Sequence, residues 1–245
     1  MNNKTLERRI IPNKSRILKK LDLCKIFLKV NFRKIIPRPM SRIIRKPIQG
    51  WIGPDISALE VFGADGSGVT RDYAHIVSSL EIWEIDKKYE NELKKKFPNA
   101  KIKITDSFKE VCETSEKFNF IVVDNGISTY GSYCEHFELF PSIFRIMEDS
   151  AILTVNIIPS VSKKMRKKWP YVFNKLHLEK RMSFYNSDHP ENLTASQMIQ
   201  TYEQLCKQNG FRIVHHFVMK RRFFLHFLVM HIQRISRKQI LFARA

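Results

Sequence analysis

The chain has 245 residues, of which 43% are hydrophobic and 11% aromatic, and its formal net charge is +19. This length is enough for one α/β domain with a full core, and the apolar and aromatic content excludes disorder throughout. The charge is uneven, because residues 1–50 hold 15 Lys and Arg against two acids, whereas residues 51–245 hold 28 against 22. The sequence therefore predicts a basic N-terminal extension over residues 1–50 and one domain over residues 51–245.

The basic extension, residues 1–50, mixes Lys and Arg with aliphatic residues and meets Pro37 and Pro39. This pattern indicates a solvated, loosely ordered extension or a partly helical, amphipathic one. Contact with RNA or with an anionic membrane surface is the functional alternative. Translation from Met40 would leave only a short lead-in before the domain.

The first predicted strand, ISALEVFG, leads into a turn with Gly63, Gly66 and Gly68, and helical character follows in VTRDYAHIVSS. Glycine is needed where the backbone takes a positive φ or where a ligand approaches closely. The spacing G-x-x-G-x-G differs from the dinucleotide fingerprint G-x-G-x-x-G. A tight strand-to-helix connection also uses glycine for structural reasons, so both interpretations stay open.

The next three strands end in acidic or amide residues. LEIWEID contains Glu84, eighteen residues after Gly66, AKIKITD ends in Asp106, and FNFIVVDN ends in Asp124 and Asn125. Glu84 at such a strand end is suited to accept hydrogen bonds from both ribose hydroxyls of a nucleoside. Asp106 is suited to the exocyclic amine of an adenine. A solvent-facing strand end for Glu84 and a helix cap for Asp106 are the alternatives.

Four segments now carry a family resemblance. EVFGADGSG, WEID, TDS and IVVDN, in this order, resemble the nucleotide-binding half of class I S-adenosylmethionine-dependent methyltransferases over residues 57–125. The resemblance implies an α/β fold: a doubly wound, mostly parallel seven-stranded sheet with helices on both faces and an antiparallel last strand. It also implies S-adenosyl-L-methionine as the cofactor, with the following contacts: Glu60 and the turn Gly63, Gly66, Gly68 on its amino-acid part, Glu84 on the ribose, Asp106 with Ser107 on the adenine, and Asp124 with Asn125 beside the methyl group.

The rest of the chain is compatible with this fold. SAILTVNII is predicted as the fifth strand, and FRIVHHFVM and FFLHFLVMHI as the last two, joined by a basic turn, Lys220 to Arg222, that faces water. The second of these runs is too short to span a membrane. Helices are expected in KKYENELKKKF, capped by Asp86, in EHFELFPSIFRIM, and after a cap at Thr194 or Ser196. The four cysteines are widely spaced, which predicts no disulfide framework and no metal site and favours a reducing, cytoplasmic compartment. The N-terminus carries no secretory signal pattern.

Asp124 and His136 are the candidate catalytic residues. The polar and aromatic stretch DNGISTYGSYCEHF follows the fourth strand, where the acceptor is expected. His136 is suited to act as a general base oriented by Glu135 or Asp124, and Tyr130 and Tyr133 to wall the substrate. The alternative is that His136 is packed or solvated in the first turn of the following helix.

The leading hypothesis is methyl transfer from S-adenosylmethionine to a small-molecule or glycan acceptor, at oxygen. Asn125 is followed by Gly126 and Ile127 instead of the Pro-Pro-aromatic turn of enzymes that methylate base amines. The basic segment SKKMRKK is either a solvated helix face or a binding surface for a phosphate-bearing acceptor. The alternatives are an RNA methyltransferase that uses the basic extension, a spermidine-synthase-like aminopropyltransferase, and a non-catalytic cofactor-binding module. The protein is expected in the cytoplasm, with a peripheral location at a membrane surface as the alternative.

Overall fold

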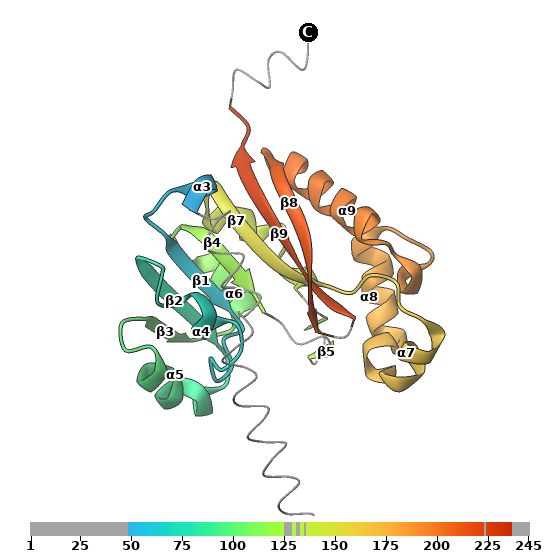
Figure 1. The fold of residues 1–245 in the computed structure, drawn as a ribbon, viewed down its shortest axis with the longest axis horizontal. Coiled ribbons are helices and arrows are strands. Elements are labelled where there is room, and N and C mark those ends of the chain that lie inside the picture. Colours follow the sequence, from blue (N-terminus) through green and yellow to red (C-terminus); the bar gives the residue numbers. More distant parts are fainter. Residues whose placement is uncertain (1–48, 125–128, 131–132, 135, 223, 237–245) are drawn as a thin grey trace, which may run out of the picture. The chain divides into compact units, whose positions relative to one another are not determined.

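The computed structural model describes residues 49–124, 129–130, 133–134, 136–222 and 224–236, which belong to a compact unit, Pro39–Ala245. In these residues seven strands form one sheet in the order β3-β2-β1-β4-β7-β9-β8 (Figure 1). Neighbours from β3 to β7 are parallel, whereas β9 is antiparallel to both β7 and β8. This arrangement confirms the predicted fold class. The basic extension falls almost entirely outside the described residues, so it stays a prediction.

All seven predicted strands are present at the expected segments. The apolar runs of β1, β2 and β4 suit strands that are buried on both faces of a parallel sheet, and nearly all of their residues are buried. The strands are β1 Ser57–Val61, β2 Ser79–Glu84, β3 Lys101–Ile104, β4 Phe118–Val123, β7 Met147–Ile157, β8 Phe211–Arg222 and β9 Leu225–Arg234. A separate antiparallel pair is formed by β5 Thr129–Tyr130 and β6 Tyr133–Cys134.

The helices connect these strands and differ widely in length. The α-helices are α3 Gln49–Ile52, α4 Thr70–Tyr73, α5 Glu90–Lys96, α6 Ser107–Glu113, α7 Lys163–Lys168, α8 Lys175–Tyr185 and α9 Ala195–Gln208. Short 3₁₀ turns are η2 Lys87–Tyr89, η3 Phe137–Leu139, η4 Ser142–Ile146, η5 Pro170–Phe173 and η6 Pro190–Asn192. No helix among the described residues has the length and apolar character needed to cross a membrane.

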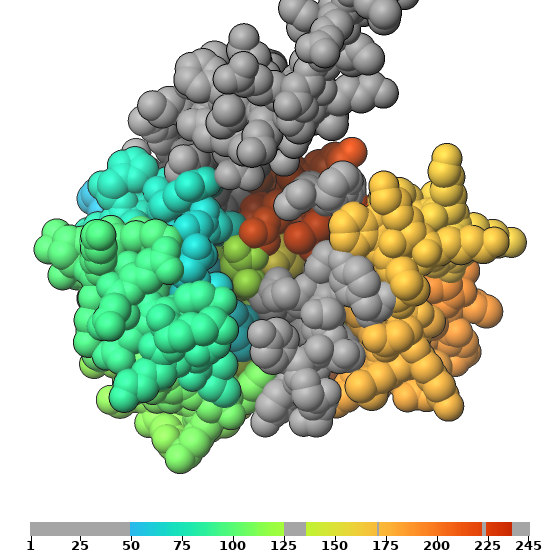
Figure 2. Space-filling view, turned by 90° about the horizontal axis from the view of Figure 1, so that it is seen from below, coloured from blue at the N-terminus to red at the C-terminus, as the bar shows by residue number. Residues whose placement is uncertain are grey.

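The carboxyl ends of β1, β2, β3, β4 and β7 lie at one edge of the sheet because these strands are parallel. The turn between β8 and β9 lies at this edge as well, since β9 runs in the opposite direction. Figure 2 views the molecule from this edge. The surface is hollowed there between the segment with β2, β3 and α5 and the segment with α7 and α8.

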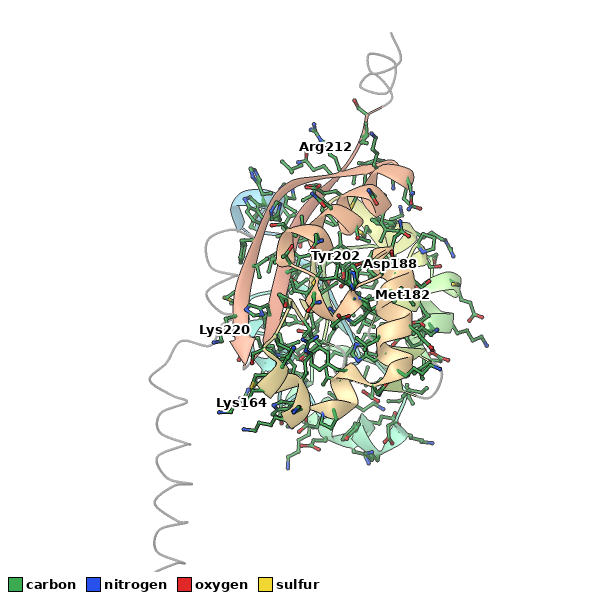
Figure 3. The ribbon with its side chains drawn as sticks, turned by 90° about the vertical axis from the view of Figure 1, so that its right-hand side faces the viewer. Lys164, Met182, Asp188, Tyr202, Arg212 and Lys220 are labelled. Atoms are coloured by element: carbon green, nitrogen blue, oxygen red, sulfur yellow. The ribbon has the colours of Figure 1, made fainter. Side chains whose placement is uncertain are left out.

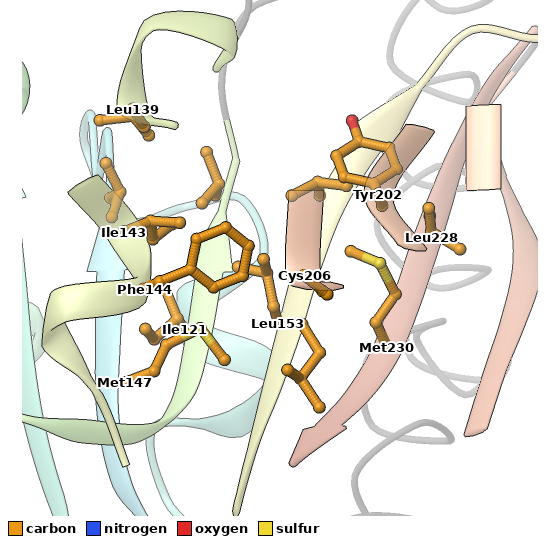
Figure 4. Packing of buried hydrophobic residues seen from close by; sticks show 14 of the residues in the cluster. Ile121, Leu139, Ile143, Phe144, Met147, Leu153, Tyr202, Cys206, Leu228 and Met230 are labelled. Carbon is orange, nitrogen blue, oxygen red and sulfur yellow. The ribbon is translucent and has the colours of Figure 1, made fainter. Parts of the chain in front are cut away.

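The two faces of the sheet carry separate cores. Neighbouring residues of a strand, such as Ile121 and Val122 of β4, point to opposite faces and join different clusters. One face packs against α6, α9, η3 and η4, and α8 and α9 lie on this side in Figure 3. Figure 4 shows Phe144, Leu153 and Met230 among the buried residues of this core. The other face packs against α3, α4 and α5.

Some local predictions are confirmed and others are wrong. Asp86 caps η2, and Thr194 caps α9 through a reciprocal capping box, as predicted. The prediction of one helix over residues 135–147 is wrong, because Pro141 cannot occupy a helix interior. One 3₁₀ turn, η3, lies before Pro141 and another, η4, follows it. The helix after the glycine turn is limited to Thr70–Tyr73, and α8 was not predicted.

Candidate active site

The glycine turn after β1 meets the carboxylate at the end of β2. Glu84 accepts a hydrogen bond at Oε2 from the Ala64 N–H, 2.6 Å away, and at Oε1 from the Asp86 N–H, 2.8 Å away. A further bond, from the Gly63 N–H to the Trp83 carbonyl at 3.0 Å, fastens the turn to β2. Glu84 is only 7% exposed. A carboxylate has about four lone-pair sites, so these two N–H groups leave about half of its acceptor capacity for a ligand.

Different neighbours restrict the side chain at each of the three glycine positions of the turn. A side chain at Gly63 would overlap a residue of β2, and one at Gly66 would overlap Phe97. Gly66 also has a φ of 66°, which favours glycine. A Cβ on Gly68 would lie 3.3 Å from Oδ2 of Asp124, so this glycine borders the end of β4. The structural alternative therefore accounts for Gly63 and Gly66, and Gly68 is the position beside Asp124, a candidate site residue.

The turn is strained and is held from outside. Phe62 and Ala64 have φ values of 66° and 47°, which residues with a side chain rarely adopt. Lys96 of α5 donates from Nζ to the Asp65 carbonyl and to the Ser67 hydroxyl, each at 2.7 Å. Strain that the surrounding structure maintains is frequent at ligand sites. No sequence motif had indicated the contribution of Lys96.

Glu60 lies at the end region of β1 with 1% of its surface exposed. Its carboxylate accepts hydrogen bonds from the hydroxyls of Tyr73 and Thr70. Burial, followed by the negative charge of Asp124, raises the pKa of Glu60 well above its ordinary value, while Tyr73 and the charge of Arg221 act in the opposite direction. Burial and the neighbouring Glu60 raise the pKa of Tyr73 as well. Glu60 thus ties α4 to β1, and its predicted contact with the cofactor stays a prediction.

Asp124, at the end of β4, is held by an arginine from the last residues of β8. Arg221 donates from Nη2 to Asp124 Oδ2 at 2.8 Å, and Nη1 bonds the other carboxylate oxygen. Asn156 of β7 donates to Asp124 at 3.0 Å and accepts from Arg221 at 3.1 Å. The guanidinium also lies over the ring of Phe227, 4.7 Å from its centre. The prediction that the whole basic turn faces water is therefore wrong at Arg221, although Lys220 is exposed.

The end of β3 and the residue after Glu84 complete this edge. Asp106 caps α6 by accepting from the Phe108 N–H at 3.0 Å, which confirms the capping alternative, and Ser107 is buried. Contact of Asp106 and Ser107 with an adenine stays a prediction. Ile85 directly follows Glu84 and is 62% exposed. The sequence analysis did not single out Ile85. An apolar residue that directly follows a carboxylate expected to bind a ribose could have been predicted to contact the flat, apolar face of a base.

His136 lies in the core on the α9 side of the sheet. It has no exposed surface, its Nε2 is 2.5 Å from the hydroxyl of Tyr202, and the rings of Phe140 and Phe184 pack around it. The packed alternative for His136 is therefore confirmed, and a catalytic role for it stays a prediction.

Several predicted site residues lie outside the described part of the chain: Asn125, Glu135 and the side chains of Tyr130 and Tyr133. Within the described residues, no group of three or more His, Cys, Asp or Glu side chains is arranged to hold a metal ion. The site that the described residues form is therefore built from the turn, Glu84, Ile85 and the cluster of Asp124, Asn156 and Arg221.

Comparisons with known proteins identify the fold. No protein-family model matches the chain, and no curated protein sequence matches it significantly. The plantazolicin methyltransferase BpumL, solved with a triazolic desmethylPZN analogue and S-adenosylhomocysteine, matches with a TM-score of 0.53 at 11% identity over 86% of this chain and 91% of that chain. The 1,6-didemethyltoxoflavin-N1-methyltransferase of Burkholderia thailandensis was also solved with S-adenosylhomocysteine. It matches with a TM-score of 0.50 at 10% identity, over 95% of this chain and 94% of that chain.

These similarities, together with the strand order, show that the chain has the fold of the class I S-adenosylmethionine-dependent methyltransferases. The family resemblance found in the sequence is thereby confirmed for the fold.

Proposed function

We propose that this protein binds S-adenosyl-L-methionine and transfers its methyl group to a small-molecule or carbohydrate-type acceptor, at oxygen. The observation that carries the proposal is the hydrogen bond from the Ala64 N–H to Glu84, which brings the strained turn and the strand-end carboxylate together. In open α/β sheets, ligands bind at the carboxyl ends of the strands, where this pair lies.

The residues at this edge fit the cofactor. The free lone pairs of Glu84 suit two ribose hydroxyls, and the exposed side chain of Ile85 suits one face of an adenine. Gly68 lets the turn approach Asp124 with no side chain between them, so the amino-acid part would meet backbone N–H groups and a carboxylate at one place. Asp124 is a fixed carboxylate, since Arg221 and Asn156 hold it, and it suits the positively charged end of the ligand.

Bound S-adenosylmethionine supplies a methyl group on a positively charged sulfur. The protein has to orient that group, exclude water and accept the proton of the acceptor. Both oxygens of Asp124 are engaged by Arg221, which favours an orienting role for Asp124 over proton abstraction. His136 is the remaining candidate base, and its use requires that the acceptor reach the core beside Tyr202.

The acceptor class is supported by the small molecules bound in the matched structures. The Burkholderia enzyme is an N1-methyltransferase solved with 1,6-didemethyltoxoflavin, and BpumL was solved with a triazolic desmethylPZN analogue. Both favour a small acceptor. Transfer to oxygen rests on the sequence alone, because the turn after β4 lacks the motif of base-amine methyltransferases.

Isothermal titration of the full-length protein with S-adenosylhomocysteine tests the cofactor site. We expect Glu84→Gln, which keeps an oxygen for the Ala64 N–H, to weaken binding about 10- to 100-fold, since hydrogen bonds to a charged group contribute about 1.5–3 kcal/mol. The control Glu113→Gln, at an exposed site in α6, should bind like the wild type. Absence of binding by the folded wild type would overturn the proposal.

A second variant separates ligand contact from folding. Ile85→Ser changes a side chain that is 62% exposed, so the thermal stability of the protein should hardly change. We expect the affinity for S-adenosylhomocysteine to fall several-fold because apolar contact with the adenine is lost. An unchanged affinity would remove Ile85 from the proposed site.

A further inference from the structure

Exposed lysines gather beside the proposed site. Helix α7 and the end of β8 contribute the following residues, here called the cationic wall: Lys163, Lys164, Lys167, Lys168 and Lys220. Within the described part of the chain none of them has an ion-pair partner, whereas Lys175 and Lys180 are paired with Glu179 and Glu138. Residues 162–180 hold seven Lys and Arg against one acid. This charge is therefore not balanced locally.

The lysines of α7 share one face of the helix. Lys163 and Lys167, like Lys164 and Lys168, are four residues apart, a spacing that brings side chains together on a helix. Like charges at this spacing destabilise a helix. Met165 lies on the inner side and packs against the protein. The helix therefore carries a self-repulsion that a bound anion would relieve.

Apolar packing fixes the wall to the proposed active site. Trp169, at the end of α7, lies 5.7 Å from the ring of Phe224, which belongs to the turn between β8 and β9. Phe224 and Val172 form one buried cluster with Ile158, which directly follows β7. The last residues of β8, directly before this turn, bring Arg221 into the cluster around Asp124. Figure 3 shows Lys164 and Lys220 at the same end of the molecule.

We propose that the cationic wall binds the phosphate groups of the methyl acceptor, which is a soluble small molecule that carries a diphosphate. This inference rests on the proposed function and names the substrate class for the same site. Lysine ammonium groups are mobile point charges and bind phosphate oxygens well. A six-residue helix is about 9 Å long. That length suits one diphosphate better than the extended backbone of a nucleic acid.

Binding of inorganic pyrophosphate to the full-length protein loaded with S-adenosylhomocysteine tests the inference, by isothermal titration. We expect the double variant Lys164→Glu/Lys168→Glu to weaken pyrophosphate binding at least about tenfold, which is about 1.4 kcal/mol. The control Lys117→Glu/Lys207→Glu changes the net charge equally, at exposed lysines before β4 and near the end of α9, and should stay close to the wild type. Residues 1–50 are present in every protein, so they contribute the same background.

The outcomes are distinguishable. In two outcomes the protein binds S-adenosylhomocysteine but the wall is not a phosphate site: the affinity for pyrophosphate falls equally in both double variants, or the wild type binds no pyrophosphate. The proposed function stands in both. If S-adenosylhomocysteine does not bind, the proposed function itself fails. A single-stranded RNA 20-mer or phosphatidylglycerol vesicles that bind through the wall while pyrophosphate does not would overturn the small-acceptor assignment. Circular dichroism checks that each variant is folded. If Lys164→Glu/Lys168→Glu does not fold, the milder double variant Lys164→Gln/Lys168→Gln takes its place.

Discussion

We predict that Glu60→Gln stabilises the protein at neutral pH. Glu60 is 1% exposed, and burial together with the charge of Asp124 raises its pKa well above the ordinary value of about 4.3. Between the two pKa values the folded protein keeps a proton that the unfolded chain has released, so the free energy of unfolding falls as the pH rises. At a pH above both pKa values, each unit by which folding raises the pKa of Glu60 lowers the free energy of unfolding of the wild type by about 1.4 kcal/mol. Gln cannot ionise, and its amide oxygen still accepts from Tyr73.

Thermal unfolding of the wild type and Glu60→Gln between pH 4.5 and pH 8 measures this effect. A change of 1 kcal/mol shifts the Tm of a domain of this size by about 2–4 °C. We expect the Tm of the variant to exceed that of the wild type at pH 8, and the difference to shrink towards pH 4.5. Glu113→Gln, at an exposed site, should show no such trend. A variant that is less stable than the wild type, increasingly so at high pH, would mean that Glu60 is ionised when folded and is stabilised by Arg221.

Three further predictions concern other parts of the chain. Gly66→Ala should destabilise the protein by about 2–4 kcal/mol, measured by denaturant unfolding, because the position has a positive φ and its Cβ would overlap Phe97; a loss under 0.5 kcal/mol would contradict the packing of the turn. Thr194→Ala removes the cap of α9 and should cost about 1 kcal/mol in the same measurement, with an unchanged stability as the contrary result. Burial raises the pKa of Cys206 to about 12, so iodoacetamide at pH 8 should alkylate the exposed Cys112 and spare Cys206 in native protein, as mass spectrometry would show.

The sequence predicts the sheet well because each strand carries its own local signal. Apolar runs that end in glycine or in an acid mark β1, β2 and β4, and parallel pairing then brings their ends to one edge. The meeting of Glu84 with the turn follows from this rule, and the bond to the Ala64 N–H confirms it. The same rule could not tell that Gly63 and Gly66 are needed for packing, because the overlaps at these positions come from residues of β2 and α5.

Helix α8 escaped prediction because its buried face is polar. The residues that it buries are His177, Arg181 and Tyr185, four positions apart, so no apolar periodicity marks the inner side. Arg181 is 1% exposed and donates to the carbonyls of Pro190 and Ile158. These acceptors lie outside α8, in η6 and directly after β7, 9 and 23 residues from Arg181 in the sequence. Only the folded chain provides the partners that make burial of an arginine favourable.

The position of Arg221 could have been derived from two predictions taken together. An antiparallel last strand requires that the turn before it lie at the carboxyl edge of the parallel strands, and the basic residues Lys220 to Arg222 were expected in that turn. The first statement is correct, and the structure places Lys220 to Arg222 in the last residues of β8 instead of the turn itself. Their position still brings a cation to the edge where Asp124 follows β4. A carboxylate that is nearly buried at this edge needs a partner of opposite charge. The fold therefore supplies Asp124 with its counter-ion from a residue 97 positions away, which no local pattern encodes.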